Sequence, residues 1–394
     1  MNRAVFCFSL LLALSIGVAN AETATGYVFE DLNGNGVRDA GEPGLAGIPV
    51  SNSRDVVLTD AEGRYTLPVE GDSILFVVKP GQWRTPVDPE TQIPRFYYVH
   101  RPEGSPKSRF GGVEATGSLP ASIDFPLIRQ EEPETFQVLM FGDTQPRNEQ
   151  EVDYIVQDIV TETTGMDVAF GATLGDLVFD NLSVFPALIG GIGLIGVPWY
   201  NIIGNHDMNY DAPEAHQAYE TYARYFGPSW YAFNYGPVHF IVLNNIYWDV
   251  NERKYHAALG EAQLDFVENN LAHVAKDRLV VLMMHIPLQD IRDRDRLFSV
   301  LKEYPNTFSL SAHWHRQMHF FLGEESGWKQ DEAHHHMVHG TACGAWWTGP
   351  YGMLGIPEPT MMDGTPHGYS IITFSNADYK IAYKAARRPA DYQM

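Results

Sequence analysis

The sequence is poor in cysteine and in positive charge. Its 394 residues include two cysteines, Cys7 and Cys343, and 27 lysines and arginines stand against 49 aspartates and glutamates, which gives a formal net charge of −22. So few cysteines exclude a disulfide-rich scaffold. The shortage of basic residues argues against a protein that coats nucleic acid, because such proteins need a basic surface. If the ligand is an anion, its binding site must overcome a repulsive overall field.

Residues 1–21 have the pattern of a secretory signal. Arg3 supplies the positive start, residues 4–18 are apolar, and the run Ala19, Asn20 and Ala21 fits a small-residue cleavage site. An uncleaved membrane anchor is the alternative. Cleavage removes Cys7 and leaves Cys343, so we expect a periplasmic or extracellular protein without an intrachain disulfide.

A second apolar run covers residues 182–203 and is long enough to cross a bilayer. Pro186 and Pro198 interrupt it, and four glycines dilute it. We therefore predict a buried helix over residues 183–195 and a buried strand over 198–203, with a transmembrane helix as the alternative. No stable membrane span is expected.

Three regions follow the signal. Residues 22–130 carry short β-branched or aromatic runs separated by turn residues, which predicts a small all-β sandwich. Residues 131–135 form a charged, proline-containing linker. Residues 136–320 alternate apolar runs with helical periodicity (residues 152–160 and 264–274), which predicts a layered α/β domain. Residues 321–394, rich in Gly, Pro and aromatic residues, are predicted as a C-terminal extension that starts a further β-rich domain.

The apolar runs of residues 136–320 end in side chains that bind metal ions. In chain order these seven are Asp143 and Gln145, then Asp176, then Asn205, then His285, and last His313 with His315. His206 and Asp207 directly follow Asn205. Ligands of open α/β sheets bind beyond the carboxyl ends of the strands. Oxygen and nitrogen donors without a thiolate suit Mn, Fe, Zn or Ni. Seven ligands exceed one tetrahedral zinc site and suit two ions that clamp a phosphoryl group.

This ordered set resembles the calcineurin-like metallophosphoesterase superfamily over about residues 136–320. The resemblance implies an α/β fold with a β-sandwich core flanked by helices, in four α/β/β/α layers, and two divalent metal ions. It implies that the first metal is held by Asp143, Gln145 and His315, that Asp176 bridges, and that the second is held by Asn205, His285 and His313. It further implies that His206 protonates the leaving group or contacts the phosphate, and that Asp207 orients His206.

The sequence departs from the superfamily pattern at three positions. Gln145 stands where the family usually has histidine, so the first metal is held by a neutral carbonyl oxygen. Phe179 stands where purple acid phosphatases have a ligating tyrosine, which speaks against an iron–phenolate site. The phosphate-gripping arginine of the protein Ser/Thr phosphatases is missing beside Asp180 and Asn181. Arg147 is the nearest substitute, and Arg147 and Asn181 are the candidate substrate-binding residues.

The resemblance implies hydrolysis of a small phosphate ester by attack of a hydroxide that bridges the metals. A phosphodiester is favoured, because a dianionic monoester gains more from the missing arginine. A phosphomonoesterase of the same superfamily is the first alternative. A cell-surface binding protein on a degenerate, inactive core is the second, and a nuclease, against which the acidity counts, is the third. The sequence gives no oligomeric state.

Residues 31–42 fit a calcium-loop template with Gly36 at its sixth position. The ligands would be Asp31, Asn33, Asn35, the backbone of Val37, Asp39 and Glu42. The alternative is an Asn/Gly-rich turn without an ion. The loop is similar to those of bacterial surface β-sandwich repeats, and residues 59–65 resemble transthyretin-like sandwiches.

Two groups near the C-terminus remain open. His334, His335, His336 and His339 are expected to form a solvated tract in a loop, with metal binding as the alternative. Trp346 is expected to pack against the core. Trp347 and Tyr351 either do the same or line the pocket beside the metals.

Overall fold

The structure, a computed structural model, describes residues 22–389 and 391–392. The predicted secretory signal and Cys7 lie outside the described residues. Among the described residues, no helix combines the length and the apolar character that crossing a bilayer requires.

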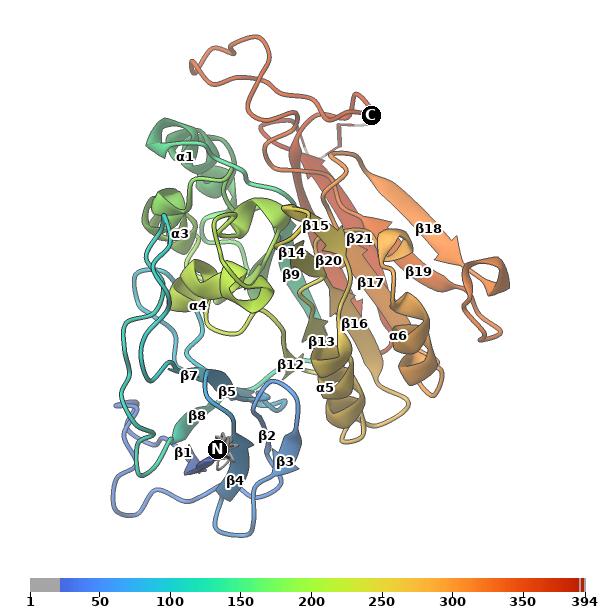
Figure 1. The fold of residues 1–394 in the computed structure, drawn as a ribbon. Coiled ribbons are helices and arrows are strands. Elements are labelled where there is room, and N and C mark those ends of the chain that lie inside the picture. Colours follow the sequence, from blue (N-terminus) through green and yellow to red (C-terminus); the bar gives the residue numbers. More distant parts are fainter. Residues whose placement is uncertain (1–21, 390, 393–394) are drawn as a thin grey trace, which may run out of the picture.

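Residues 22–129 form two four-stranded sheets with the orders β4-β1-β8-β6 and β3-β2-β5-β7 (Figure 1). Strand β4 alternates buried residues (Tyr65, Leu67, Val69) with exposed ones, as a strand with one face on a core should. The strands are β1 (Glu22–Glu30), β2 (Pro49–Ser51), β3 (Val56–Leu58), β4 (Arg64–Val69), β5 (Ser73–Val77), β6 (Trp83–Arg84), β7 (Tyr97–His100) and β8 (Phe125–Arg129).

The core of the larger region is a sandwich of two sheets with the orders β11-β10-β9-β20-β21 and β12-β13-β16-β17-β19-β18. Strands β9, β10 and β11 run parallel, as do β13, β16, β17 and β19. The strands are β9 (Thr135–Phe141), β10 (Phe170–Leu174), β11 (Trp199–Ile202), β12 (Tyr231–Tyr235), β13 (Val238–Val242), β16 (Leu279–Met283), β17 (Thr307–Ser311), β18 (Met318–Leu322), β19 (His334–Val338), β20 (Gly368–Ser375) and β21 (Asp378–Ala385). A separate hairpin joins β14 (Ile246–Asp249) to β15 (Lys254–Ala257).

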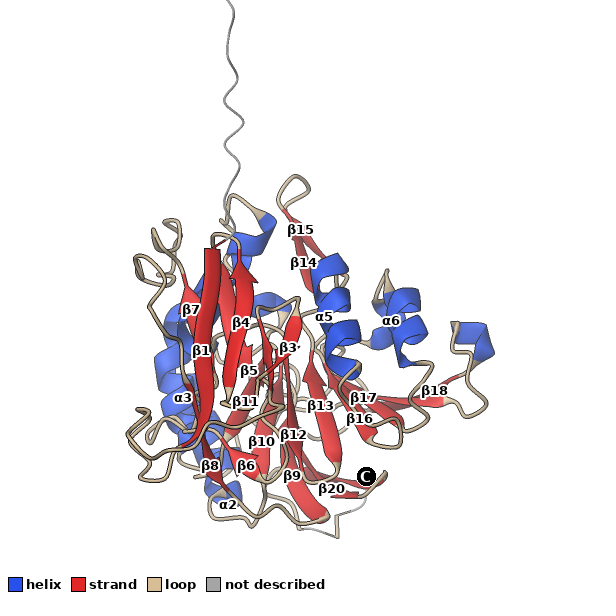
Figure 2. Cartoon of the chain, turned by 90° about the horizontal axis from the view of Figure 1, so that it is seen from below, coloured by secondary structure: helices blue, strands red, loops and turns tan. Residues whose placement is uncertain are grey.

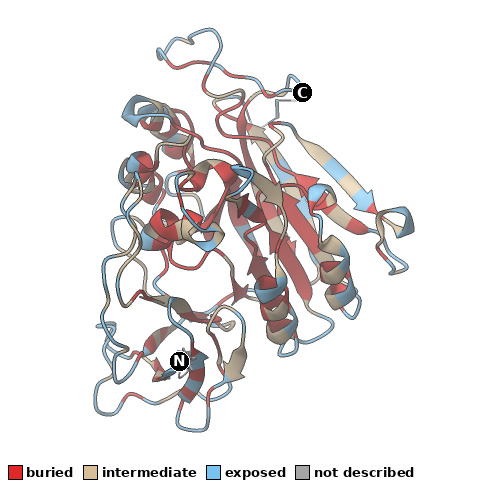
Figure 3. Cartoon of the chain, in the orientation of Figure 1, coloured by how far each residue is buried: buried red, intermediate tan, exposed pale blue. Residues whose placement is uncertain are grey.

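Helices cover both outer faces of this sandwich. On β9, Leu139 and Phe141 pack in the cluster that includes α3, whereas Val138 and Met140 face the cluster between the sheets. Figure 2 shows the strands between α3 on one side and α5 and α6 on the other. The result is a four-layer α/β/β/α arrangement. Figure 3 shows its central strands as mostly buried, whereas the edge strand β18 is largely exposed or intermediate. The α-helices are α1 (Glu149–Ile155), α2 (Thr161–Thr163), α3 (Phe185–Gly193), α4 (Glu220–Phe226), α5 (Glu261–Leu271) and α6 (Arg294–Leu301).

Shorter helical turns connect these elements. A π-helical turn, η1 (Val156–Val160), links α1 to α2, and the 3-10 turns are η2 (Leu182–Val184), η3 (Asn205–Asp207), η4 (Ala215–Tyr219), η5 (Leu288–Asp290) and η6 (Glu324–Ser326). The apolar run of residues 182–203 folds into η2, α3 and β11. This confirms the predicted buried helix followed by a buried strand, because the glycines and prolines keep the helix to nine residues.

The residues after 320 complete the sandwich, which differs from the prediction that they start a further domain. Strand β19 pairs with β17 in one sheet, and β20 pairs with β9 in the other. The sequence contains no local signal for this, because each pairing joins strands that lie far apart along the chain. A boundary at residue 320 would remove strands from both core sheets.

Two ion pairs with buried side chains fasten the N-terminal sandwich to the core. Lys79 Nζ lies 2.6 Å from Glu132 Oε1 and also donates to the carbonyl oxygen of Asn234 on β12. Arg101 donates to both carboxylate oxygens of Glu220 on α4. Burial is tolerated because each charge has a partner and further hydrogen bonds.

Candidate metal centre

The predicted metal ligands all lie at the carboxyl ends of parallel core strands. Asp143 and Gln145 follow β9, Asp176 follows β10, and Asn205 lies in η3 after β11. In the second sheet His285 follows β16, and His313 and His315 follow β17. Both sheets of the sandwich therefore present their ligand-bearing ends to one region. Ligands of α/β proteins bind beyond the carboxyl ends of the strands, so this region is the expected site.

The backbone at these positions is unusual. Five of the seven predicted ligands, namely Asp143, Gln145, Asp176, His313 and His315, have φ between +30° and +67°. Left-handed conformations are rare for residues other than glycine and cluster at functional sites. Glycine is required beside them: a Cβ on Gly204 would lie 2.0 Å from the backbone nitrogen of Asp176, and one on Gly175 would lie 2.4 Å from the His285 ring.

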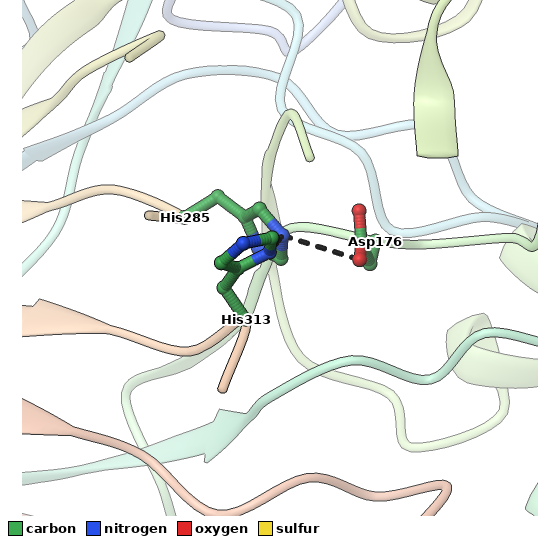
Figure 4. Close-up of side chains that lie close together, drawn as sticks. All are labelled: Asp176, His285 and His313. Atoms are coloured by element: carbon green, nitrogen blue, oxygen red, sulfur yellow. Dashed lines mark hydrogen bonds and ion pairs between the residues drawn. The ribbon is translucent and has the colours of Figure 1, made fainter. Parts of the chain in front are cut away.

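Asp176, His285 and His313 form a group whose ligand atoms all lie within 4.8 Å of one another (Figure 4). Asp176 Oδ2 lies 3.2 Å from His285 Nε2, and His313 Nδ1 lies 3.2 Å from the same nitrogen. Asn205 Oδ1 is also 3.2 Å from His285 Nε2. These four residues are the predicted ligands of the second ion and the predicted bridge.

The ligands predicted for the first ion lie close to Asp176 or to one another. Gln145 Nε2 donates to Asp176 Oδ2 at 2.8 Å, and His315 Nε2 lies 3.7 Å from Asp143 Oδ1. Asp143 is fully buried, and its Oδ1 has no hydrogen-bond partner among the described residues. A buried carboxylate oxygen without a donor is costly unless a cation offsets it. The oxygen and nitrogen donors of these residues therefore fit a centre of two metal ions.

Backbone carbonyl groups fix the orientation of two histidines. His285 Nδ1 donates to the carbonyl oxygen of Leu174 at 2.8 Å, and His315 Nδ1 donates to that of Gly344 at 2.6 Å. Each contact leaves Nε2 as the ligand nitrogen, which is how outer contacts commonly set the tautomer of a metal-binding histidine.

The buried charges of the centre perturb one another. Burial raises the pKa of Asp143 well above its usual range, and the neighbouring Asp176 adds to the rise. Burial opposes ionisation of His285, but Asp176 outweighs it and raises the pKa of His285 to about 9. Burial, and then His285, lower the pKa of His313 to about 3. Burial therefore disfavours the charged form of Asp143, and a divalent cation bound beside it would favour the carboxylate.

Asp180, rather than the predicted Asp207, contacts the ring of His206. Asp180 Oδ1 accepts from His206 Nδ1 at 2.7 Å, and the ring stacks on Phe179 with centroids 4.5 Å apart. Burial tends to lower the pKa of His206, but the hydrogen bond to Asp180 and the charge of Asp176 raise it overall. The Nε2 atom stays available for a substrate.

Asp207 has a different task. Its buried carboxylate accepts the backbone N–H groups of Leu177, Val178 and Gly204 at 2.8–3.0 Å. These bonds hold the turn after β10 against the turn after β11. Its place beside His206 in the sequence suggested a contact that the geometry of the 3-10 turn does not make, so the predicted role is corrected to a structural one.

The candidate substrate residues lie beside the centre without a shared hydrogen bond to it. Arg147 pairs with Glu151 at 3.2 Å and lies over the ring of Phe179, 5.2 Å from its centroid. Asn181 Nδ2 donates to the carbonyl oxygen of Arg147 at 3.3 Å. Phe179 therefore connects Arg147 to His206, while the charge of Arg147 is already matched by Glu151.

The histidine tract is not a solvated loop. His334, His335 and His336 belong to β19, and His334 and His336 are buried. His334 contacts the hydroxyl groups of Thr307 and Ser309. His336 contacts those of Ser309 and Ser311. Their polar atoms are satisfied by neighbouring strands, so their role is structural.

The two neighbouring tryptophans differ in burial, and Trp347, whose role the sequence left open, packs in the core. Trp347 is the buried one and donates to the carbonyl oxygen of Thr144. Trp346 is half-buried and lies against the ring of His315, with centroids 4.7 Å apart. Tyr351 is 69% exposed.

The residues predicted to bind calcium form a compact loop. Asp31 accepts the N–H groups of Gly34 and Gly36, and Glu42 accepts those of Leu32 and Asp39. Hydrogen bonds from Asn33 and Asn35 lower the pKa of Asp39. Asp31 and Glu42 are buried, whereas Asn33, Asn35 and Asp39 are exposed to solvent.

Comparison with known proteins places this centre in a family. Three family models match the chain: the N-terminal region of calcineurin-like phosphoesterases over residues 32–113, calcineurin-like phosphoesterase over residues 136–317, and the C-terminal region of calcineurin-like phosphoesterases over residues 336–394. No curated protein matches the sequence.

Solved structures with a similar arrangement include two phosphatases and PhoD. One is the purple acid phosphatase PPD1 from yellow lupin (Lupinus luteus) seeds, at 14% identity and a TM-score of 0.45, covering 93% of this chain and 68% of that one. Another is PhoD, at 12% identity and a TM-score of 0.45, covering 92% and 85%. A third is a dimetal phosphatase from Danio rerio, at 12% identity and a TM-score of 0.44, covering 64% and 96%.

The fold and the centre define a metal-dependent hydrolase of phosphoric esters. The models for the N-terminal, catalytic and C-terminal regions of the calcineurin-like phosphoesterases together match most of the chain, so the chain belongs to this family.

Proposed function

We propose that this chain is an exported phosphodiesterase whose two divalent ions are held by the seven predicted ligands. The observation that carries the proposal is the convergence of five strand ends on Asp176, together with the buried, unpartnered Oδ1 of Asp143. When bound, the two ions supply the nucleophile and neutralise charge on the phosphoryl oxygens. Their positive charge also lets a protein with a net charge of −22 bind an anion.

The protein's own residues orient the substrate and assist departure of the leaving group. His206 holds Nε2 toward the substrate side because its other nitrogen is bound to Asp180. From there it donates a proton to the oxygen of the departing alcohol, as a general acid. Phe179 supports the ring from one face.

The preference for a diester rests on the pairing of Arg147. A monoester carries more negative charge than a diester and gains more from a free arginine beside the ions. Arg147 is bound to Glu151, so its charge is already matched. A singly charged diester needs less positive charge from the site than a doubly charged monoester.

A substrate panel tests the preference. Protein loaded with Mn²⁺ should hydrolyse bis-p-nitrophenyl phosphate with a kcat/KM about tenfold above that for p-nitrophenyl phosphate, which corresponds to about 1.4 kcal/mol. A higher kcat/KM for the monoester would favour the phosphomonoesterase alternative. Binding of two ions without turnover of either ester would favour the surface-binding alternative.

Export is proposed on the pattern of residues 1–21. The chain recovered from cells should begin at Glu22 when its N-terminus is sequenced. A chain that keeps residues 1–21 would contradict cleavage.

We also propose that residues 31–42 bind calcium, supported by the buried carboxylates of Asp31 and Glu42 at the two ends of the loop. Added Ca²⁺ in the millimolar range should raise the unfolding temperature of the whole chain by a few degrees, because extracellular calcium loops bind at 10⁻⁴–10⁻³ M. Asp31→Ala should abolish the shift, and Asp60→Asn, outside the loop, should keep it. No shift in the unaltered protein would favour the ion-free turn.

A further inference from the structure

Cys343 is a buried thiol that contacts the first metal position at three points. Its Sγ lies 3.4 Å from Gln145 Oε1 and 3.9 Å from His315 Nδ1, and the side chain is fully buried. Its backbone N–H donates to the carbonyl oxygen of Asp143 at 3.0 Å. One residue therefore touches each of the three residues that we assign to the first ion alone.

The thiol contacts the first-ion ligands on atoms other than the nitrogen that we assign to the ion. It is close to His315 Nδ1, the nitrogen that donates to Gly344, and not to Nε2, which faces Asp143. A neutral thiol is a poor metal ligand but a weak hydrogen-bond donor and acceptor.

The amide of Gln145 has two unlike ends. In the structure Nε2 donates to Asp176 Oδ2 at 2.8 Å, and Oε1 accepts from Cys343. A metal ion binds the carbonyl oxygen and not the NH₂ group, because the NH₂ group has no free electron pair to give. With an ion at the first position, the amide must therefore turn, so that Oε1 lies on the Asp176 side and Nε2 faces Cys343.

We propose that Cys343 is a positioning residue for the first metal position: its thiol accepts the Nε2–H of Gln145 while the Gln145 carbonyl oxygen faces the ion. The proposal rests on the binuclear centre proposed above. Without a partner at residue 343, the turned amide would leave a buried N–H group unpaired, which is costly. The unpartnered Oδ1 of Asp143 marks the place that the ion would take.

Titration of metal-free protein with Mn²⁺ in a calorimeter tests the proposal. Cys343→Ala should weaken one of the two Mn²⁺ binding steps about tenfold, at the low end of the effects of outer-shell residues, and leave the other step unchanged. Cys343→Ser should keep the affinity, because a hydroxyl group also donates and accepts. Cys343→Val, which also removes the hydrogen-bonding atom, takes the place of the alanine variant if that variant does not fold.

A double-mutant cycle separates positioning from packing. In a Gln145→Ala background, Cys343→Ala should have no further effect on Mn²⁺ affinity. A loss that persists in that background would overturn the proposal, as would unchanged affinity in Cys343→Ala. Sulfur-to-cobalt charge-transfer absorption in the Co²⁺-loaded protein would overturn it by making Cys343 a ligand. Wild-type protein that binds no Mn²⁺ would overturn this proposal and the proposed function together.

Discussion

Asp176→Ala should lower the hydrolysis of bis-p-nitrophenyl phosphate about 10³-fold or more. The carboxylate lies between the two ligand groups, 3.2 Å from His285 Nε2 and 2.8 Å from Gln145 Nε2. Its loss weakens both metal positions, and the ions contribute several kcal/mol of transition-state stabilisation at 1.36 kcal/mol per tenfold of rate. Initial rates at saturating Mn²⁺ measure the effect.

A matched control distinguishes loss of the centre from a general loss of charge. Asp153→Asn removes one exposed carboxylate on α1 and should leave the rate unchanged. Circular dichroism should show that Asp176→Ala keeps its secondary structure. Strand β20 pairs with β9 and β19 pairs with β17, and neither pairing includes residue 176. Full activity in Asp176→Ala would refute the mechanism.

His206→Ala should lower turnover about 10²–10⁴-fold for a substrate with a basic leaving group, the usual range for loss of a general acid. The effect should be smaller for bis-p-nitrophenyl phosphate than for diphenyl phosphate, because nitrophenolate leaves with less need of a proton. The measurement is kcat for the two esters in both proteins. Equal losses on the two esters would assign His206 to phosphate binding instead, and His216→Ala, an exposed histidine, is the control.

Asp180 should matter only through His206. Asp180→Asn removes the carboxylate that accepts from His206 Nδ1, and a loss of about tenfold is expected by analogy with other outer contacts of functional histidines. In a His206→Ala background the same change should cost nothing more. An additive loss would mean that Asp180 acts on the substrate or the metals independently.

The candidate ligands could be placed at strand ends from the sequence because that signal is local. Each ligand directly follows an apolar run, and a buried strand has a carboxyl end wherever the run stops. Asp176 and His285 were therefore assignable from their immediate neighbours, although they belong to different sheets. The alternation of strand and helix predicted a layered α/β domain. The four-layer arrangement was implied by the resemblance to calcineurin-like phosphoesterases.

The remaining contacts depend on which turns meet in space. Asp207 is next to His206 in the chain, but the 3-10 turn directs its carboxylate to the turn after β10, and Asp180 reaches the ring instead. Cys343 lies 198 positions from Gln145, so no spacing rule joins them. The prediction for the histidine tract was wrong for a related reason. Its polar residues suggested a loop, whereas hydroxyl groups of β17 form hydrogen bonds with the rings of His334 and His336 inside a sheet.

The number of Mn²⁺ ions bound per chain tests the central claim most directly. Metal-free protein should take up two ions, regain hydrolysis of bis-p-nitrophenyl phosphate as they bind, and lose it again in a chelator. Asp176→Ala should fail to retain the pair of ions under the same conditions. One ion or none per chain, with full turnover that a chelator does not remove, would contradict the binuclear centre.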